Sequence, residues 1–369
     1  VRVVMTPDAE EFVTPLTLST LSKNPVLSSF TDTEKNWNNH VELGEWADFM
    51  LIAPATANTL SKMDSGKSDN LLLTTYLSAK CSVYIAPAMD LDMYKHHTTQ
   101  DNIQALKQNN HFFIEPESGE LASGLEGKGR LAEPENIVEF ISQHLQSQMP
   151  LYGKKVLITA GPTYEAIDPV RYIGNHSSGK MGYEMAKTAL SLGAEVILIS
   201  GPTHLSISHS NLNLIKVKTA DEMFEHTIQH FNDVDIAIAS AAVSDYKPKT
   251  VYEQKVKKTE DNLTIELVKN PDILKTMGKM KKHQFLVGFA LETNDEINHA
   301  KQKLKKKNLD FIILNSLNDK GAGFKSDTNK ISIITKENIK RFDTKPKSEV
   351  ARDIFDMILE MKFKTKTYA

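Results

Sequence analysis

Short apolar runs alternate with longer stretches of helical spacing along the whole chain. In the first half the apolar runs are Val1–Met5, Phe49–Ala53 and Val83–Ala86, and each ends in a polar or Pro-containing loop. In the second half they are Val156–Thr159, Val196–Ile199, Leu212–Val217 and Asp235–Ala239, with helical spacing over Met181–Leu192 and Asp221–Phe231. Uninterrupted apolar runs are typical of parallel strands, because helices cover both faces of a parallel sheet. The pattern therefore predicts an α/β fold.

The length and a polar linker indicate two domains. A helical stretch, Ile137–Leu145, is followed by Ser147-Gln148-Met149-Pro150, and the chain has 369 residues. We expect one domain over residues 1–149 and a second over residues 150–369. The chain opens inside a strand-like run with Val1 and shows no signal peptide, so we expect a first strand and helix to be missing from the first domain. Four glycines before the linker predict a mobile hairpin or flap: Gly119, Gly124, Gly127 and Gly129.

Composition narrows the classes of partner. Charged residues make up 25% of the chain and the net charge is −3, so no overall field favours nucleic acid or a membrane surface. No apolar run approaches the length of a membrane span. The single cysteine, Cys81, excludes an intrachain disulfide and favours a reducing compartment, hence the cytoplasm. Lysine runs in the second half are interpreted as solvated helix faces, since aromatic residues for base stacking are not interleaved with them.

The stretch from Val156 to Gly182 has the character of an anion site. A strand-like run ends at Gly161-Pro162-Thr163, and a second polar loop, Asn175–Gly179, leads into a helix. Free backbone N–H groups at a helix start favour phosphate. A P-loop is matched only in part, because Met181 stands where Ser or Thr would hold magnesium. We predict an anion site that includes Arg171; an ordinary polar turn is the alternative.

Other polar residues follow the predicted strands, where parallel sheets bind ligands. The loop Pro54–Thr59 suits a flat phosphorylated cofactor, although a helix start capped by Thr56 or Asn58 explains it equally well. Asp245 can accept from a sugar hydroxyl or a cytosine amine, or it caps a turn. His40 is a candidate base, and a surface or capping histidine is the alternative.

The second half resembles phosphopantothenate–cysteine ligases. The similarity lies in DPVRYIGNHSSGKMG, AAVSDY, KVKK, LVKNPDIL, VGFALET and KQKLKKKNLD, in this order. It implies that Lys255 contacts the α-phosphate of CTP, that Asn175 holds an acyl-cytidylate, and that Asn315 with Gly323 and Phe324 belongs to a later loop. It implies further CTP contacts at Ala239, Ser240, Ala241, Asp245, Pro271, Asp272, Ile273, Leu274, Phe289, Lys303 and Lys307. Magnesium would be held largely by phosphate oxygens.

The first half resembles flavin-dependent cysteine decarboxylases. His40, the run PATANT and the run PAMDLDM carry the similarity. It implies that His40 acts as the base, that Met93 and Asp90 lie at the substrate carboxylate, and that FMN is bound by Pro54, Ala55, Thr56, Asn58 and Met89. Two residues depart from the family pattern. Asp90 replaces an asparagine that donates to a carboxylate, and Ser123 replaces a cysteine that protonates the product-forming intermediate, although a hydroxyl is a far weaker acid than a thiol.

Together the resemblances imply a bifunctional coenzyme A enzyme of two Rossmann-like domains, a flavodoxin-type FMN domain followed by a ligase domain. They imply 4′-phosphopantothenate, cysteine and CTP as substrates, FMN and Mg²⁺ as cofactors, and a homo-oligomer of ligase dimers and decarboxylase trimers. Two alternatives remain. In one, Asp90 and Ser123 mark an impaired flavin domain that serves as a scaffold for the ligase. In the other, the lysine-rich half binds nucleic acid.

Overall fold

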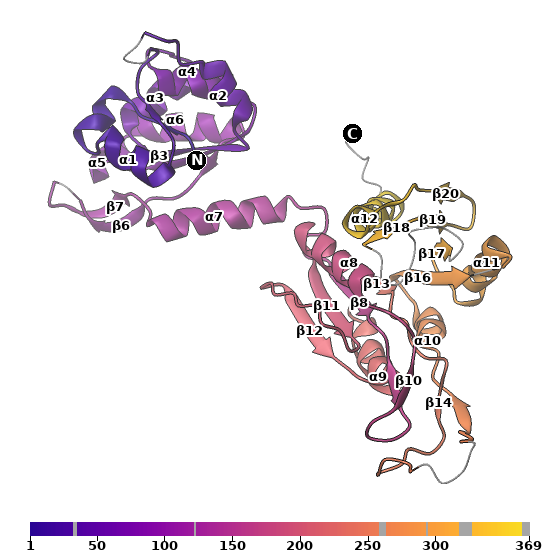
Figure 1. The fold of residues 1–369 in the computed structure, drawn as a ribbon. Helices are drawn as coiled ribbons and strands as arrows, with labels where there is room; N and C mark the ends of the chain where they lie inside the picture. The colour runs from indigo at the N-terminus through magenta and orange to yellow at the C-terminus, as the bar shows by residue number, and fades with distance from the viewer. Residues whose placement is uncertain (32–34, 122, 258–262, 293, 317–326, 364–369) are drawn as a thin grey trace. The chain divides into compact units, whose positions relative to one another are not determined.

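The computed structural model describes residues 1–31, 35–121, 123–257, 263–292, 294–316 and 327–363 (Figure 1). Four positions named above, Lys258, Thr293, Gly323 and Phe324, lie outside these ranges. The chain forms two compact units, Val1–Leu145 and Gln146–Ala369. Each has its own buried core, as expected for an α/β chain of this length.

The first unit is built on three parallel strands, β3 (Phe49–Ala55), β4 (Ser82–Pro87) and β5 (Phe112–Phe113), in the order β3-β4-β5. One buried cluster joins these strands to α3 (Ala57–Asp64), α4 (Leu71–Ser78) and α6 (His97–Gln108). A second cluster joins Tyr84 and Ala86 to α7 (Pro134–Ser147). Helices therefore cover both faces of the sheet, which is why its central strand is buried and apolar after Ser82.

The first strand run does not join this sheet. β1 (Val3–Val4) pairs with β2 (Val26–Leu27), and the two form a separate parallel sheet beside α1 (Pro15–Ser22). β3 is consequently an edge strand of its sheet, and Phe49 and Leu51 are 40% and 39% exposed on it. A strand of this apolar composition is typical of a sheet interior, so the described residues leave an apolar edge uncovered.

The predicted glycine-rich hairpin is present. β6 (Glu117–Glu120) and β7 (Glu126–Arg130) pair in antiparallel fashion ahead of α7 (Figure 1). The remaining elements of this unit are a 3-10 helix (Pro7–Glu11), α2 (His40–Trp46) and α5 (Leu91–Lys95). α2 packs against α4.

The second unit contains an eight-stranded sheet with the order β12-β11-β8-β13-β16-β17-β19-β20. Its first six strands are parallel and the last two pairings are antiparallel. The strands are β8 (Lys155–Ala160), β11 (Glu195–Ser200), β12 (Leu212–Lys216), β13 (Ile236–Ala239), β16 (Phe285–Glu292), β17 (Phe311–Ser316), β19 (Ile331–Ile334) and β20 (Ile339–Arg341). The predicted α/β class with a parallel-rich sheet is confirmed.

Helices cover both faces of this sheet as well. One buried cluster contains residues of α8 (Lys180–Ser191) and α12 (Lys347–Phe363), and the other contains residues of α9 (Ala220–Phe231), α10 (Ile273–Met280) and α11 (Glu296–Lys306). The helices predicted over 181–192 and 221–231 are thus present with ends shifted by one residue.

Two hairpins extend from this unit as an arm (Figure 1). β9 (Tyr164–Ala166) pairs with β10 (Tyr172–Gly174), and β14 (Tyr246–Pro248) pairs with β15 (Leu267–Lys269). A further short pair, β18 (Thr328–Asn329) with β21 (Lys345–Pro346), precedes α12.

Candidate functional site

The strand order of the larger sheet identifies where a ligand fits. From β8 the chain moves outward to β11 and β12 on one side, then returns to β13 and β16 on the other. The connections therefore reverse direction between β8 and β13. A crevice outside the carboxyl ends of the strands opens at such a point, and ligands of open α/β sheets bind there. The loops after β8 and β13 also meet directly, through a bridge between Pro162 and Ala242.

Backbone hydrogen bonds hold the loop after β13 against β8. The N–H of Ala241 donates to Oγ1 of Thr159 (3.3 Å), and that of Ala242 donates to the carbonyl of Gly161 (2.9 Å). Farther along, the N–H of Ser244 donates to Oγ1 of the fully buried Thr163 (3.0 Å). The segment that carries Ala239–Asp245 is therefore fixed to the strand that precedes the predicted anion loop.

Asn175 lies at this crevice. Its Nδ2 donates to the carbonyl of Val243 at 3.0 Å, although the two residues are 68 positions apart. The side chain thereby joins the loop before α8 to the loop after β13. α8 then starts with Gly179 in the left-handed region, and Gly182 packs so closely on β8 that an added Cβ would lie 2.5 Å from that of Ala160. The close approach explains the glycine in the motif.

The lysines predicted to bind nucleotide make internal contacts in this structure. Nζ of Lys303 donates to the carbonyl of Phe289 (2.9 Å), and Nζ of Lys307 lies 3.0 Å from Oδ1 of Asp272. Asp272 also caps α10 by accepting from the N–H of Lys275. Burial raises the pKa of Asp272, but these hydrogen bonds outweigh it and hold the pKa below the usual range. The predicted residues thus form two contacting pairs, and Lys307 is already paired to a carboxylate.

Pro271, Ile273 and Leu274 belong to the same segment. Ile273 and Leu274 are buried in the core beneath the sheet. An added Cβ at Gly288 would lie 2.9 Å from the Leu274 side chain, so the strand packs tightly there. These two side chains serve packing, and only their backbone groups can face a nucleotide.

Arg171 differs from the anion-binding role that we expected from its position. Its Nε and Nη2 donate to the carboxylate of Asp168, and Nη2 also donates to the carbonyl of Val256 (3.1 Å). Lys255, next to Val256, is exposed. Asp168 was not predicted, because nothing in the sequence marks it as buried.

Asn270 was also missed. Its Nδ2 donates to the carbonyl of Ser244 (2.8 Å) and its N–H to the carbonyl of Asp245 (2.9 Å), so it holds the loop after β13 from the side opposite Thr163. Among the described residues, Oδ1 of Asn270 and Oγ of Ser244 are buried side-chain atoms without a hydrogen-bond partner. Such atoms are costly in a closed core, and a ligand or water at the crevice would satisfy them.

In the first unit, the loop after β3 caps a helix. Oγ1 of Thr56 accepts from the N–H of Thr59 (3.3 Å) at the start of α3, so the capping alternative is confirmed for Thr56. Pro54 and Asn58 are exposed beside it, while Ala55 is buried and accepts from the N–H of Ala88 (3.1 Å). The loops after β3 and β4 therefore meet at the carboxyl edge of the sheet.

The hairpin packs on the loop after β4. The N–H of Met89 donates to the carbonyl of Gly129 (3.0 Å), and an added Cβ at Gly129 would lie only 2.3 Å from the carbonyl oxygen of Met89. Met93 is half exposed, and Asp90 precedes α5 without capping it through its side chain. Ser123 is exposed between the two strands of the hairpin. The hairpin thus reaches the predicted substrate loop.

His40 begins α2 and is partly buried. Its ring lies edge-on to Trp37 with centroids 6.0 Å apart, and its Nδ1 is a buried atom without a partner among the described residues. A helix that precedes a parallel strand starts toward the carboxyl edge of the sheet. The unsatisfied nitrogen fits a residue that meets a ligand at that edge.

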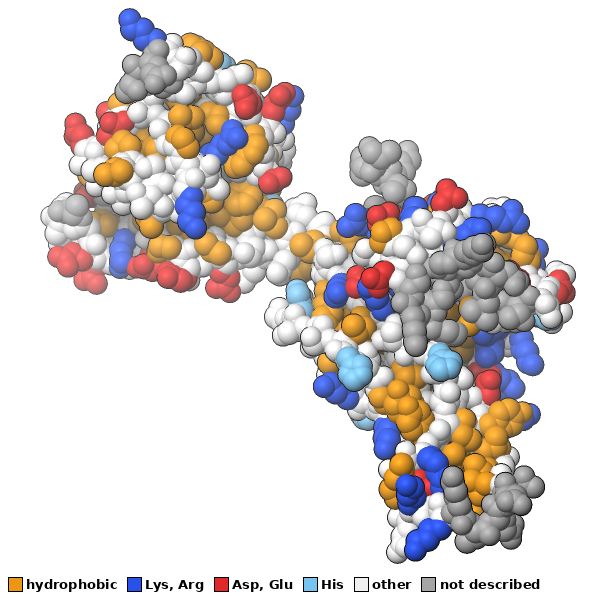
Figure 2. Space-filling view, viewed as in Figure 1, with side chains coloured by type: hydrophobic (Ala, Val, Ile, Leu, Met, Phe, Trp, Pro, Cys, Tyr) orange, Lys and Arg blue, Asp and Glu red, His pale blue; other side chains and the backbone are white. Residues whose placement is uncertain are grey.

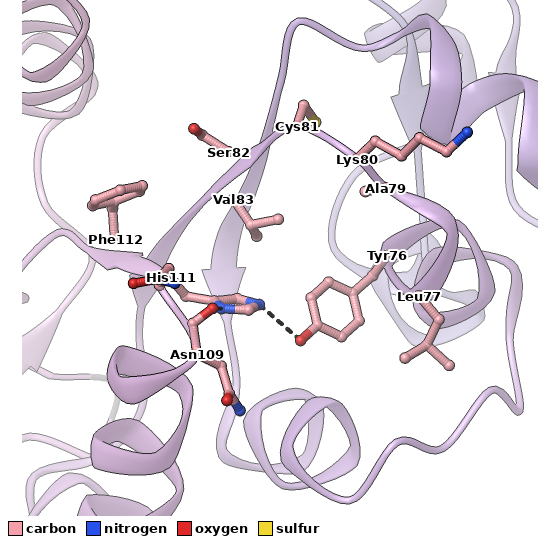
Figure 3. A pocket seen from close by; sticks show the side chains of 11 residues that line it. Tyr76, Leu77, Ala79, Lys80, Cys81, Ser82, Val83, Asn109, His111 and Phe112 are labelled. Carbon is pink, nitrogen blue, oxygen red and sulfur yellow. Dashed lines mark hydrogen bonds between the residues drawn. The ribbon is translucent and has the colours of Figure 1, made fainter. Parts of the chain in front are cut away.

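The most evident hollow of the first unit lies elsewhere. A shallow pocket opens at the amino end of β4, lined by Cys81, Tyr76 and His111, whose Nε2 lies 2.8 Å from the Tyr76 hydroxyl (Figure 3). Cys81 is half-buried, and burial raises the pKa of its thiol. Because parallel sheets bind ligands at the opposite edge, this pocket is not the candidate site. A second shallow pocket, at the amino ends of β8, β11 and β12, is excluded for the same reason.

Comparisons with known proteins cover both units. A family described as DNA/pantothenate metabolism flavoprotein C-terminal domain matches residues 151–361, and the family Flavoprotein matches residues 1–146. The coenzyme A biosynthesis bifunctional protein CoaBC of Bacillus subtilis is 48% identical over 92% of this chain and 85% of its own length. The chain belongs to the CoaBC family.

Two further relatives bear on the CoaBC assignment. A solved C-terminal domain of a CoaBC protein is 42% identical, with a TM-score of 0.51, and covers 59% of this chain and all of its own. A cysteine/cysteine sulfinic acid decarboxylase from an unknown prokaryotic organism is 54% identical over 95% of this chain and 99% of its own length. The predicted family and fold class are confirmed, and the alternative of a ligase with an impaired flavin domain is not favoured.

The polar and apolar groups at the carboxyl edge of the first unit's sheet fit the flavin that the CoaBC family implies. The exposed Pro54, Thr56 and Asn58 at the start of α3, with the buried unpaired nitrogen of His40, offer apolar surface and hydrogen-bonding groups to a flavin. Throughout the described ranges, no group of three or more His, Cys, Asp or Glu side chains is placed to hold a metal ion. No helix in the same ranges is long and apolar enough to cross a bilayer.

Proposed function

We propose that this chain catalyses two consecutive steps of coenzyme A biosynthesis. The first is CTP-dependent ligation of cysteine to 4′-phosphopantothenate, and the second is FMN-dependent decarboxylation of the 4′-phosphopantothenoylcysteine formed. The observation that carries the ligase step is the meeting of Asn175 with the loop after β13 at the reversal point between β8 and β13. Membership of the CoaBC family supports the pairing of the two steps.

In the ligase step the carboxylate of phosphopantothenate attacks the α-phosphorus of CTP. A new P–O bond forms and pyrophosphate leaves, giving an acyl-cytidylate. Lys255 lies against the α-phosphate and offsets its charge in the transition state, while Mg²⁺ is held largely by phosphate oxygens. The amine of cysteine then attacks the acyl carbon, CMP leaves, and Asn175 keeps the acyl group in place.

Lys303 and Lys307 of this site already make hydrogen bonds within the protein. Lys307 must leave Asp272, or bind phosphate together with it, when CTP arrives. Ala239, Ser240 and Ala241 bring backbone groups close to the nucleoside, and Asp245 accepts from its sugar or base. Asn270 and Ser244 supply two buried polar atoms at the same loop.

When bound, FMN would supply a reversible two-electron oxidation of the cysteinyl thiol, which makes loss of CO₂ possible. The residues that would hold it follow β3 and β4: Pro54, Ala55, Thr56, Asn58 and Met89. His40 removes a proton from the substrate. The hairpin β6–β7 packs on the substrate loop and excludes water from it, and we assign to Ser123 the role of returning a proton.

Product analysis tests this proposal directly. Protein supplied with FMN, phosphopantothenate, CTP, Mg²⁺ and cysteine should yield pyrophosphate, CMP, CO₂ and 4′-phosphopantetheine, identified by mass. Lys255→Ala should slow pyrophosphate release about 100-fold, as expected when one transition-state contact is removed. Asn175→Ala should slow the cysteine-dependent step instead. Unchanged rates in both variants would contradict the assigned roles.

A second candidate function concerns free amino acids. The relative at 54% identity is named a cysteine/cysteine sulfinic acid decarboxylase, so a working decarboxylase is favoured over an inert scaffold. Asp90 fits such a substrate, because a carboxylate repels a substrate carboxylate but attracts the free ammonium of an amino acid. Phosphopantothenoylcysteine carries an uncharged amide at that position.

Comparing the three substrates distinguishes the two candidate functions. CO₂ release should be measured with phosphopantothenoylcysteine, cysteine and cysteine sulfinic acid under identical conditions. If the first substrate is preferred, Asp90→Asn should leave the preference unchanged or increase it. If the amino acids are preferred, Asp90→Asn should remove that preference, since the neutral amide no longer attracts their ammonium group.

We further propose a cytoplasmic homo-oligomer, with the arm of the second unit as a subunit contact. Hydrophobic side chains are exposed along this arm, beside Lys and Arg (Figure 2). They include Val170, Tyr172, Val251, Tyr252 and Leu267. Exposed apolar patches of this kind mark interaction surfaces. Light scattering should therefore give a mass above that of one chain, and Val170→Asp should lower it.

A further inference from the structure

The turn between β9 and β10 contains a buried carboxylate. The side chain of Asp168 is fully buried, and its two oxygens accept five hydrogen bonds. Oδ1 accepts from the N–H groups of Val170 (2.8 Å) and Arg171 (2.9 Å). Oδ2 accepts from the Arg171 guanidinium and from the N–H of Val256 (3.2 Å). A buried carboxylate is stable only when it is paired and hydrogen-bonded in this way.

Three of the contacts at this turn reach a distant part of the chain. Val256 donates to Asp168 and accepts from Nη2 of Arg171, so both polar groups of its peptide backbone are held. Four residues earlier, the N–H of Tyr252 donates to the carbonyl of Ile167 (3.0 Å). The segment 252–256 is therefore attached to the turn at both of its ends.

Lys255 lies between these two attachments and next to one of them. Its side chain is exposed, whereas its backbone is fixed through Val256. An exposed lysine has high rotamer entropy, and the position of its backbone decides which volume the ammonium can reach. Fixing that backbone is thus the means by which the fold can direct Lys255 toward a phosphate.

We propose that Asp168, together with Arg171, is a positioning residue for Lys255 in the CTP-dependent step. The inference rests on the proposed ligase function. Asp168 and Arg171 together form a clamp on the segment 252–256. Asp168 balances the charge of Arg171, and Nη2 of Arg171 donates to the backbone carbonyl of Val256. The free positive charge at the α-phosphate then comes from Lys255.

The kinetic test is a double-mutant cycle. Asp168→Asn keeps the shape of the side chain but replaces one acceptor oxygen by a donor and leaves Arg171 without its counter-ion. We expect kcat for CTP-dependent pyrophosphate release to fall about 10- to 100-fold, the loss expected from a misplacement of about 1 Å, with a smaller change in KM for CTP. In a Lys255→Ala background the same change should cost less than about twofold, because its effect passes through Lys255. Independent, multiplicative losses would overturn the proposal.

Asp353→Asn is the matched control. It also removes a carboxylate paired with a lysine, since Oδ2 of Asp353 lies 2.9 Å from Nζ of Lys345, but on α12. Its rate of pyrophosphate release should stay within about twofold of the starting protein. If Asp168→Asn fails to fold, Arg171→Lys takes its place: a lysine keeps the charge but not the fork that joins Asp168 to Val256.

Proteolysis provides a readout that does not depend on activity. Trypsin cleavage after Lys255 and Lys257 should be faster in Asp168→Asn and Arg171→Lys than in the starting protein and in Asp353→Asn. Unchanged cleavage in both variants would overturn the clamp. If the starting protein releases no pyrophosphate, the proposed function fails, and the cleavage rates still decide whether Asp168 holds the segment.

Discussion

Asp168 is a buried carboxylate paired with the guanidinium of Arg171. The Arg171 guanidinium, aided by three backbone N–H groups, outweighs the opposing effect of burial and holds the pKa of the Asp168 carboxyl well below its usual range. A group with a depressed folded pKa binds its proton more readily in the unfolded chain. It therefore stabilises the fold above the unfolded pKa of about 3.9, and this contribution disappears as pH falls through the folded value.

This gives a prediction about acid. The urea midpoint of the second unit should be lower in Asp168→Asn than in the starting protein by a constant amount between pH 7 and 5. The gap should narrow below about pH 4, because the carboxylate then becomes protonated in the unfolded starting protein while it stays ionised in the folded one. Urea titrations followed by circular dichroism at pH 7, 5, 4 and 3 measure it. A gap that widens with acid would contradict the depressed pKa.

Among single residues, the sequence predicted side chains that belong to recognisable motifs. It missed side chains whose contacts join distant parts of the chain. Asn175 was assigned its role through the resemblance of its motif to the ligase family. Asp168 and Asn270 were missed as contacts between distant segments. Val256 lies 88 residues from Asp168 and Ser244 lies 26 residues from Asn270, and the local sequence does not report either contact. The pairing of Lys307 with Asp272 was hidden for the same reason.

Among the elements, the hairpin β6–β7 depends on a backbone approach that only glycine permits. Gly129 lies against the carbonyl of Met89, where a Cβ has no room. Gly119 in the paired strand has space, since the nearest atom to an added Cβ is Arg130 Cδ at 3.5 Å. The two glycines therefore differ in function although they share one hairpin.

Gly129→Ala should detach the hairpin from the loop after β4, because the added methyl group contacts rigid backbone and not a flexible side chain. We expect faster proteolysis within residues 117–130 and at least about a 10-fold loss of decarboxylation, with pyrophosphate release unchanged. Gly119→Ala is the control and should retain both properties. Equal behaviour of the two variants would show that the contact with Met89 is unimportant.

Element prediction succeeded where the apolar pattern was long. Hydrophobic periodicity predicted the helices α8 and α9 and the central strands. Glycine spacing predicted the hairpin. The partner of the first strand was not predicted. β1 pairs with β2, and β3 lies at an edge of its sheet. An apolar run predicts a strand that is covered on both faces, but it does not state which strand lies beside it.

Over the whole molecule, the two units have separate cores. No residue is shared between the buried clusters of residues 1–145 and those of residues 146–369. Each unit is therefore large enough to fold as a domain. The arrangement explains how one chain can carry two chemistries whose sites lie on different sheets.

A fragment of residues 146–369 should therefore fold alone and release pyrophosphate from CTP at a rate within about threefold of the full chain, because its core and its crevice are complete. Activity with added phosphopantothenate and cysteine, together with a cooperative thermal transition, measures this. The fragment should release no CO₂. A fragment that is unfolded, or folded but inactive, would mean that the first unit contributes to the ligase site.

The pairing of α8 with α12 also sets an order of events during synthesis. α8 follows the first strand of its sheet, yet the helix that packs beside it is α12, the last helix of the described residues. One face of the sheet stays open until residues 347–363 have left the ribosome. The first unit meets no such delay and can fold while the second is still being translated. A stop codon shortly before α12 would thus release a chain with a finished flavin half and a ligase half exposed to chaperones and proteases.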